Sequence, residues 1–124
     1  MKRKEEIVEK IQDLIHEIVD YTERPLLNLS VHITRELGLN YTYLSNTFSE
    51  VTNITIERFY IQTKIEKAKL MLRESDMDIQ EVAHHLHYCS KAHFSSQFKF
   101  VTGINPSEYR RKHTPMKTSS RKTS

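Results

Sequence analysis

The densest group of side chains that could do chemistry lies around the single cysteine of the chain. Imidazole nitrogens and a thiolate bind zinc or copper, and one stretch of ten residues holds His84, His85, His87, Cys89 and His93. His84 and His85 are neighbours in a segment with helical periodicity, so their side chains point about 100° apart. Histidines on a solvated helix surface are the commoner explanation of such a run. We therefore expect no metal site and no cofactor here.

Enzyme chemistry finds little support elsewhere in the sequence. A nucleophilic Cys89 would need a histidine base and a third group that orients this base, and no such third group stands out. The sequence holds no glycine-rich phosphate loop and no HExxH motif. We expect a protein that is not an enzyme.

Length and composition narrow the fold. The 124 residues make one domain or two very small ones, and only 2 glycines and 3 prolines disfavour folds built on glycine-rich turns. No apolar run approaches the roughly 20 residues of a membrane span, and Glu5 follows the basic N-terminus directly, so we expect neither a membrane segment nor a secretory signal. One cysteine cannot form an internal disulfide, which favours the reducing cytoplasm.

The net charge of +3 is unevenly distributed. Residues 110–124 hold six basic and no acidic residues, whereas residues 1–20 hold four basic and six acidic ones. The basic excess therefore lies at the C-terminal end, where residues 113–124 are rich in Ser, Thr and Lys and are expected to be disordered. A basic chain is compatible with nucleic-acid binding, but most of the excess positive charge of this chain lies in the tail.

Helical periodicity runs through the whole chain, and no segment keeps the period of two that marks a strand. Apolar residues at spacings of three and four predict about seven helices. Four of them are predicted at residues 5–20, 30–37, 41–51 and 56–73, and three more begin at about residues 78, 90 and 105. The predicted caps and stops between them are Gly38, Asn40, Asp78 with Glu81, Ser90, and Asn105 with Pro106.

The chain repeats itself at an interval of about 50 residues. Residues 33–39 match residues 82–88 at an offset of 49, and residues 40–54 match residues 90–104 at an offset of 50. The second copy thus has one extra residue in its turn. Each copy has the pattern of a helix-turn-helix: a short helix, a tight turn and a capped second helix. Two generic helical hairpins are the plainer alternative, but the register runs through caps, turn and apolar face together.

The repeat and the segment between its copies resemble the C-terminal DNA-binding domain of AraC/XylS-type transcription regulators. Residues 64–69 (Lys-Ile-Glu-Lys-Ala-Lys) look like that family's linker core, and residues 79–110 are similar to its most specific signature. The resemblance covers about residues 26–112. It implies an all-α fold in which a long central helix joins two helix-turn-helix subdomains, a homeodomain-like pair.

The resemblance also implies the domain organisation. Residues 1–25 would be an N-terminal amphipathic helix and connector, residues 26–112 the DNA-binding domain, and residues 113–124 the basic tail. The domain itself would consist of a first helix-turn-helix at 30–51, a linker helix at 56–73 and a second helix-turn-helix at 78–101.

This sequence departs from the family's pattern at three positions. His87 stands where glycine is usual, so the second turn is expected to be strained, or relieved by its extra residue. Leu29 stands where a capping Ser or Asp is expected, so Asn28 or Ser30 would cap instead. Thr34 replaces a small alanine and needs a partner for its hydroxyl.

Base readout is expected from the outer faces of the two second helices. Because Leu44, Phe48 and Val51 would face inward, the first of these helices presents Thr42, Tyr43, Ser45 and Asn46. These positions match the family's base-contacting set, except that Tyr43 would pack on the sugar-phosphate backbone. The amide of Asn46 can pair bidentately with adenine.

The second of these helices would present Lys91, Ala92, Ser95, Ser96 and Lys99. Lys91 would contact guanine or a phosphate, Ala92 a thymine methyl group, and Lys99 a phosphate. Neither helix carries an arginine, so affinity would depend partly on backbone contacts, for which Arg110, Arg111 and Lys112 are candidates. A solvated surface position is the alternative for each residue.

These observations predict a sequence-specific double-stranded DNA-binding transcription regulator that places two recognition helices in successive major grooves. The alternative is a small helical protein-interaction or regulatory module without specific DNA binding. Its working face would be residues 5–20, which either pack on the core or form a weak homodimer through a seam of Ile7, Ile11, Leu14 and Ile18. RNA polymerase is a further candidate partner. We expect a stand-alone regulator or a fragment of a larger one, and the target sequence, the inducer and the sign of regulation stay open.

Overall fold

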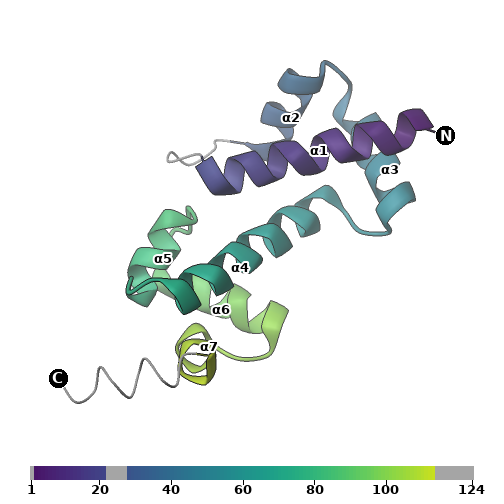
Figure 1. Cartoon of the computed structure of the whole chain (residues 1–124). Helices are drawn as coiled ribbons and strands as arrows, with labels where there is room; N and C mark the ends of the chain where they lie inside the picture. The colour runs from purple at the N-terminus through teal and green to yellow at the C-terminus, as the bar shows by residue number, and fades with distance from the viewer. Residues whose placement is uncertain (1, 22–27, 114–124) are drawn as a thin grey trace, which may run out of the picture. The chain divides into compact units, whose positions relative to one another are not determined.

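The computed structural model describes residues 2–21 and 28–113, and this part of the chain is built from seven α-helices without a strand (Figure 1). The helices are α1 (Lys2–Tyr21), α2 (Leu29–Leu37), α3 (Tyr41–Thr52), α4 (Ile56–Glu74), α5 (Ile79–His85), α6 (Lys91–Thr102) and α7 (Pro106–His113). The predicted all-α fold of about seven helices is confirmed. The connector expected before residue 26 and the disorder expected for residues 114–124 lie outside the described residues. None of the described helices has the length and apolar character to cross a membrane.

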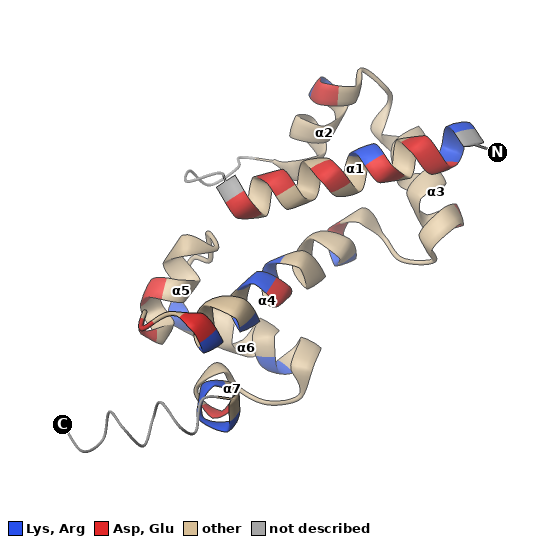
Figure 2. Cartoon of the chain, in the orientation of Figure 1, with Lys and Arg blue, Asp and Glu red and all other residues tan. Residues whose placement is uncertain are grey.

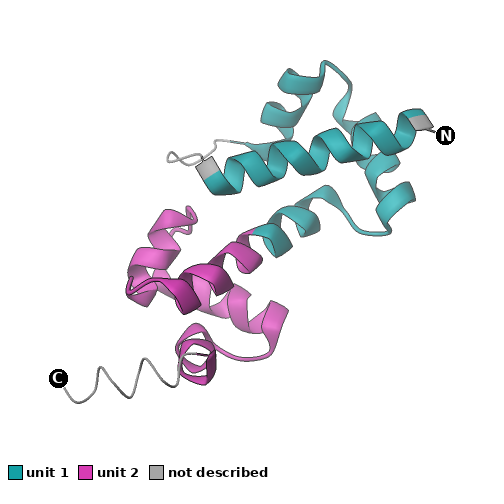
Figure 3. Cartoon of the chain, in the orientation of Figure 1, with its two compact units in different colours: residues 1–63 teal, residues 64–124 magenta. Residues whose placement is uncertain are grey.

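The chain divides into two compact units, residues 1–63 and 64–124 (Figure 3). Unit 1 contains α1, the α2–α3 pair and the start of α4, and unit 2 contains the rest of α4, the α5–α6 pair and α7. Each unit therefore places one helical segment before its helix-turn-helix pair. The helix α1, expected to be a segment separate from the DNA-binding domain, belongs to unit 1.

The core of unit 1 forms where α1 packs on α3. Ile11 and Ile15 of α1 are completely buried, as are Leu44 and Phe48 of α3. Ile33 supplies the buried residue of α2. The apolar face of α1 thus packs within the chain, which is the first of the two roles considered for residues 5–20. Among its four seam residues, only Leu14 keeps intermediate exposure.

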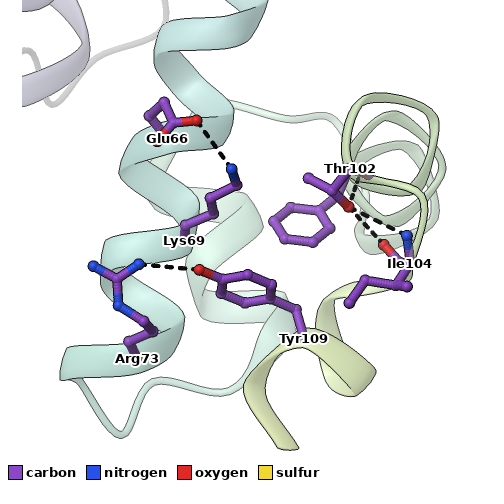
Figure 4. Close-up of polar contacts among 7 residues, drawn as sticks. Glu66, Lys69, Arg73, Thr102, Ile104 and Tyr109 are labelled. Atoms are coloured by element: carbon purple, nitrogen blue, oxygen red, sulfur yellow. Dashed lines mark hydrogen bonds and ion pairs between the residues drawn. The ribbon is translucent and has the colours of Figure 1, made fainter. Parts of the chain in front are cut away.

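The core of unit 2 gathers apolar residues from four helices. The completely buried ones are Ile65, Ala68 and Leu72 of α4, Val82 of α5, and Phe94 and Phe98 of α6, with Pro106 opening α7. The rings of Phe98 and Tyr109 meet at 5.5 Å, and the guanidinium of Arg73 donates a hydrogen bond to the Tyr109 hydroxyl at 3.0 Å (Figure 4). These contacts fix α7 against α4.

The helix that follows each helix-turn-helix pair is capped and packed in the same way in both units. Thr55 and Asn105, which are 50 residues apart, cap α4 and α7 by accepting from Arg58 N at 3.0 Å and Glu108 N at 2.8 Å. The ring pair Phe48–Phe59 in unit 1 has a centroid distance of 5.6 Å, close to that of Phe98–Tyr109 in unit 2. The sequence repeat therefore extends beyond residue 104, and α7 begins as α4 does.

One residue assigned to the core is exposed. Val51, expected to face inward, is 39% exposed, whereas Thr47, which was not assigned to the core, is only 2% exposed. The equivalent Val101 in α6 is also 40% exposed. Both valines lie on the inward side by helix phase, but each occupies the last turn of its helix, beyond the most deeply buried residues.

Candidate nucleic-acid interface

The two helices that would contact DNA begin at the predicted caps. The side chain of Asn40 accepts from the backbone N–H groups of Thr42 at 2.8 Å and Tyr43 at 3.3 Å. The hydroxyl of Ser90 accepts from His93 N at 3.1 Å. Because these caps satisfy N–H groups that the helix leaves without partners, they fix the first turns of α3 and α6.

The turns before these helices each contain one residue with a left-handed φ. Gly38 has φ 66° and His87 has φ 67°, both in the left-handed region. The extra residue of the second turn therefore does not relieve the positive φ of His87. The extra residue instead changes the hydrogen bond that closes the turn. In the first turn Gly38 N donates to Thr34 O, four residues earlier, at 2.7 Å. In the second turn Tyr88 N donates to Ala83 O, five residues earlier, at 3.0 Å.

The C-terminal ends of α3 and α6 are also built alike. Thr52 donates to Phe48 O at 2.8 Å and accepts from Ile54 N at 3.3 Å. Thr102 makes the equivalent bonds to Phe98 O at 2.8 Å and from Ile104 N at 3.3 Å (Figure 4). Each second helix is thus held at both ends by side chains at matching positions of the repeat.

The residues predicted to contact DNA lie on the outer faces of these helices. On α3, Thr42, Tyr43 and Asn46 are exposed, and Ser45 is half-buried. The predicted residues of α6 are likewise exposed at Lys91, Ala92, Ser96 and Lys99, with Ser95 half-buried. Ser45 and Ser95 are equivalent in the repeat, so each exposed face has its edge at the same place.

His93 belongs to this surface but was not predicted as a contact residue. It is exposed in the first turn of α6, at the position equivalent to Tyr43, and its ring meets that of Tyr88 edge-on at 5.2 Å. The offset of 50 residues could have identified it, because Tyr43 was already among the candidates. The run of histidines around it suggests metal binding instead.

Tyr88 holds the second turn against α4. It is buried, its hydroxyl donates to Gln97 Oε1 at 2.5 Å, and the ammonium of Lys64 lies 4.1 Å from its ring centroid. Burial lowers the pKa of Lys64 to about 8, and the electrostatic interaction with Cys89 opposes this shift. Across residues 2–21 and 28–113, no three His, Cys, Asp or Glu side chains come together as a metal site would require.

Comparison with known proteins identifies the family. A family model described as a helix-turn-helix domain matches residues 33–112, which include both helix pairs and the helix between them. The chain belongs to the AraC-type helix-turn-helix family.

Relatives of this AraC-type chain are described as regulators. It is 31% identical over 106 residues to the uncharacterized HTH-type transcriptional regulator YtdP of Bacillus subtilis, covering 86% of this chain and 14% of that protein. The chain thus spans about one seventh of that relative's length. Its fold is similar to the C-terminal domain of AraT, a response regulator from Geobacillus stearothermophilus (24% identity, 87% and 86% coverage, TM-score 0.77). It is also similar to the DNA-binding domain of AdpA in complex with a target DNA (18% identity, 91% and 96% coverage, TM-score 0.69).

The first helix-turn-helix of this AraC-type chain accommodates both of its departures locally. Asn28 caps α2, accepting from Ser30 N at 2.9 Å and Val31 N at 3.4 Å, so Leu29 becomes the first helical residue. The hydroxyl of Thr34 donates to Val31 O at 3.0 Å. The expected cap and the expected hydroxyl partner are therefore both present.

Arg110 has a different place from the one expected of a phosphate contact. Its guanidinium donates to Leu72 O at 2.9 Å and to Ser75 O at 3.2 Å, so it satisfies carbonyl groups at the C-terminal end of α4. Arg111 and Lys112, the other two basic candidates, are exposed. The basic end of the AraC-type domain thus divides into one structural arginine and two accessible cations.

The electrostatics of the two outer faces differ. The charged residues of α6 are all basic (Figure 2). On α3 the acidic Glu50 lies four residues after Asn46, but its carboxylate pairs with Lys4 of α1 at 3.2 Å. Neither face therefore presents an isolated carboxylate to a polyanion.

Proposed function

We propose that this chain is the DNA-binding part of a transcription regulator and binds double-stranded DNA at specific sequences. The observation that carries the proposal is the duplicated helix-turn-helix. Two helices with matching caps and C-terminal threonine bonds each expose a face that carries hydroxyl, amide or ammonium groups. A helix presented in this way can lie in the major groove and turn its exposed face toward the base edges.

The relatives support this proposal. YtdP is described as a transcriptional regulator, and the AdpA domain was solved with a target DNA. Membership of the same family extends these functions to the present chain as a proposal.

Each residue of the proposed interface then has a chemical role. Asn46 pairs with adenine through its amide, Thr42 and Ser45 donate or accept as the base requires, and Tyr43 packs on the backbone. Lys91 contacts guanine or a phosphate, Ala92 contacts a thymine methyl group, and Ser95 and Ser96 contact base edges. Lys99, Arg111 and Lys112 bind phosphates, which gives affinity without sequence preference.

One chain would occupy two successive major grooves at an asymmetric site, because the two exposed faces differ in sequence. A homodimer through residues 5–20 would need the apolar face that packs on α3, and we therefore propose binding as a monomer. RNA polymerase would be contacted by a surface of the bound chain away from α3 and α6. We place this activity in the cytoplasm, where the free thiol of Cys89 stays reduced.

Selection of bound duplexes from a random pool tests the proposal. We expect an enriched, non-palindromic motif with two parts about one helical turn apart. A gel shift at moderate salt then compares the affinity for the selected duplex with the affinity for a random duplex. Absence of retardation at micromolar protein would favour the protein-interaction alternative, and a palindromic motif that requires two chains would contradict monomeric binding.

A further inference from the structure

Phe100 is the most exposed large apolar residue in the part of the chain that the structure describes. Its side chain is 80% exposed, whereas Val31, Leu70 and Val101 are between 40% and 47% exposed. It lies in the last turns of α6, next to Lys99. A single exposed apolar residue needs no explanation by itself, so its meaning depends on which residues share its face.

Helix geometry places Phe100 on the face proposed to contact bases. Ala92, Ser96 and Phe100 follow one another at intervals of four, so each is turned only about 40° from the one before. All three are exposed, and they lie opposite the completely buried Phe94 and Phe98. We call Ala92, Ser96 and Phe100 the outer row of α6.

The chemistry of the outer row differs from that of the equivalent positions in α3. The repeat aligns it with Thr42, Asn46 and Glu50, which offer hydroxyl, amide and carboxylate groups. Glu50 is held by Lys4, while Phe100 presents an accessible ring. The outer row of α6 thus offers a methyl group, a hydroxyl and an aromatic ring, and it bears no charge.

An uncharged apolar side chain has one specific target among the base edges of the major groove. The C5 methyl group of thymine is the apolar feature there, whereas the other edges present donors and acceptors. We infer that Phe100 is a specificity-determining residue that contacts a thymine methyl group, and that with Ala92 it makes the half-site of unit 2 thymine-rich. This inference deepens the proposed function and rests on it.

The spacing of the outer row sets the spacing of the thymines. Ala92 and Phe100 are eight residues apart, or about 12 Å along the helix axis. With base pairs stacked about 3.4 Å apart, a helix that lies along the groove spans three to four base pairs over this distance. We expect the thymine contacted by Phe100 three or four positions from the one contacted by Ala92.

A thermodynamic cycle between Phe100 and the methyl group tests the contact. The probe is the duplex selected by the intact chain, with single thymines replaced by deoxyuridine, which lacks only the methyl group. Loss of one buried methyl group should weaken binding of the intact chain about fourfold at one position. The Phe100→Ala variant should bind the thymine and deoxyuridine duplexes equally well. With a cytosine–guanine pair at that position, the intact chain should bind the 5-methylcytosine duplex more tightly than the cytosine duplex.

Val101→Ala is the matched control. Val101 is also an exposed apolar residue of α6, but it lies about 140° from Ser96 and outside the outer row. It should leave the deoxyuridine effect unchanged. Circular dichroism should show that both variants keep their helical content.

The outcomes separate the two proposals. If the intact chain selects no motif, the proposed function fails and the inference falls with it. If a motif is selected but Phe100→Ala retains the full deoxyuridine effect, only the inference is overturned. A Phe100→Ala variant that changes self-association in sedimentation without changing DNA affinity would likewise overturn it, since Phe100 would then belong to a protein contact.

Discussion

Gly38 and His87 occupy equivalent positions of the two turns with the same φ to within a degree, although only one of them is glycine. The left-handed conformation costs an L-residue roughly 1–2 kcal/mol relative to its usual regions, and glycine avoids this cost because it has no Cβ. The second helix-turn-helix therefore holds a strained residue at a point where the first does not.

Replacing His87 with glycine should stabilise the protein. We expect the free energy of unfolding to rise by about 1 kcal/mol, because the turn keeps its shape without the steric cost. The urea midpoint at constant m-value measures this change. Gly38→Ala is the matched control and should lower the stability by about 1 kcal/mol through backbone strain alone, since no atom lies within 4 Å of the added Cβ. A neutral or destabilising His87→Gly would mean that the imidazole makes a contact worth more than the strain.

Substitutions of Arg110 and Arg111 should affect different properties, the first the stability of the fold and the second the affinity for DNA. Arg110→Ala leaves two carbonyl groups at the end of α4 without their donor and should cost about 1–2 kcal/mol of unfolding free energy. Arg111→Ala should leave the stability within about 0.5 kcal/mol and weaken binding to all duplexes alike. Denaturation curves and salt-dependent binding measure the two effects. The reverse assignment would restore Arg110 as a phosphate contact.

Lys64 should make stability depend on pH in the alkaline range. Its pKa is lowered to about 8 by burial, while an unfolded lysine titrates near about 10.4. Between these values the unfolded state binds more protons than the folded state, so the free energy of unfolding should rise with pH. Lys64→Met should lack this rise. The difference between the two denaturation series from pH 7 to 10 isolates the effect from the tyrosines, and parallel series would contradict it.

Asn46 and Lys99 should affect specificity differently. Asn46→Ala should relax the preference at one or two base pairs by about 1–3 kcal/mol, because its exposed amide is the best bidentate partner on α3. Lys99→Ala should weaken all sequences about equally. Affinities for the selected duplex and its single-base variants measure both. A uniform loss with Asn46→Ala would show that α3 is oriented differently in the groove.

The features that the sequence predicted well are local ones. Asn40, Ser90 and the Asp78–Glu81 capping box bond to N–H groups two or three residues away, so their pattern is visible in a short window. Exposure at the end of a helix depends on which neighbours reach it, and helix phase does not report this, so the inward placement of Val51 is wrong.

The features that escaped prediction depend on distant partners. Arg110 reaches carbonyl groups 35 and 38 residues before it, and no periodicity signals such a bond. The packing of α1 on α3 is likewise non-local, so the sequence leaves it open beside self-association of residues 5–20. His93 lies within the histidine run, which suggests metal binding, and Phe100 is not among the predicted contact residues although it lies four residues after Ser96.

The correspondence between α4 and α7 makes this fold extendable by design. α4 closes unit 1 through Phe59 and continues as the first helix of unit 2, while α7 closes unit 2 through Tyr109. His113 corresponds to Thr63 at the offset of 50, so a second copy of residues 64–113 joined directly after His113 would keep the register of the repeat. Further helix-turn-helix units could therefore be joined or exchanged at this helix, which would give proteins that recognise longer target sites.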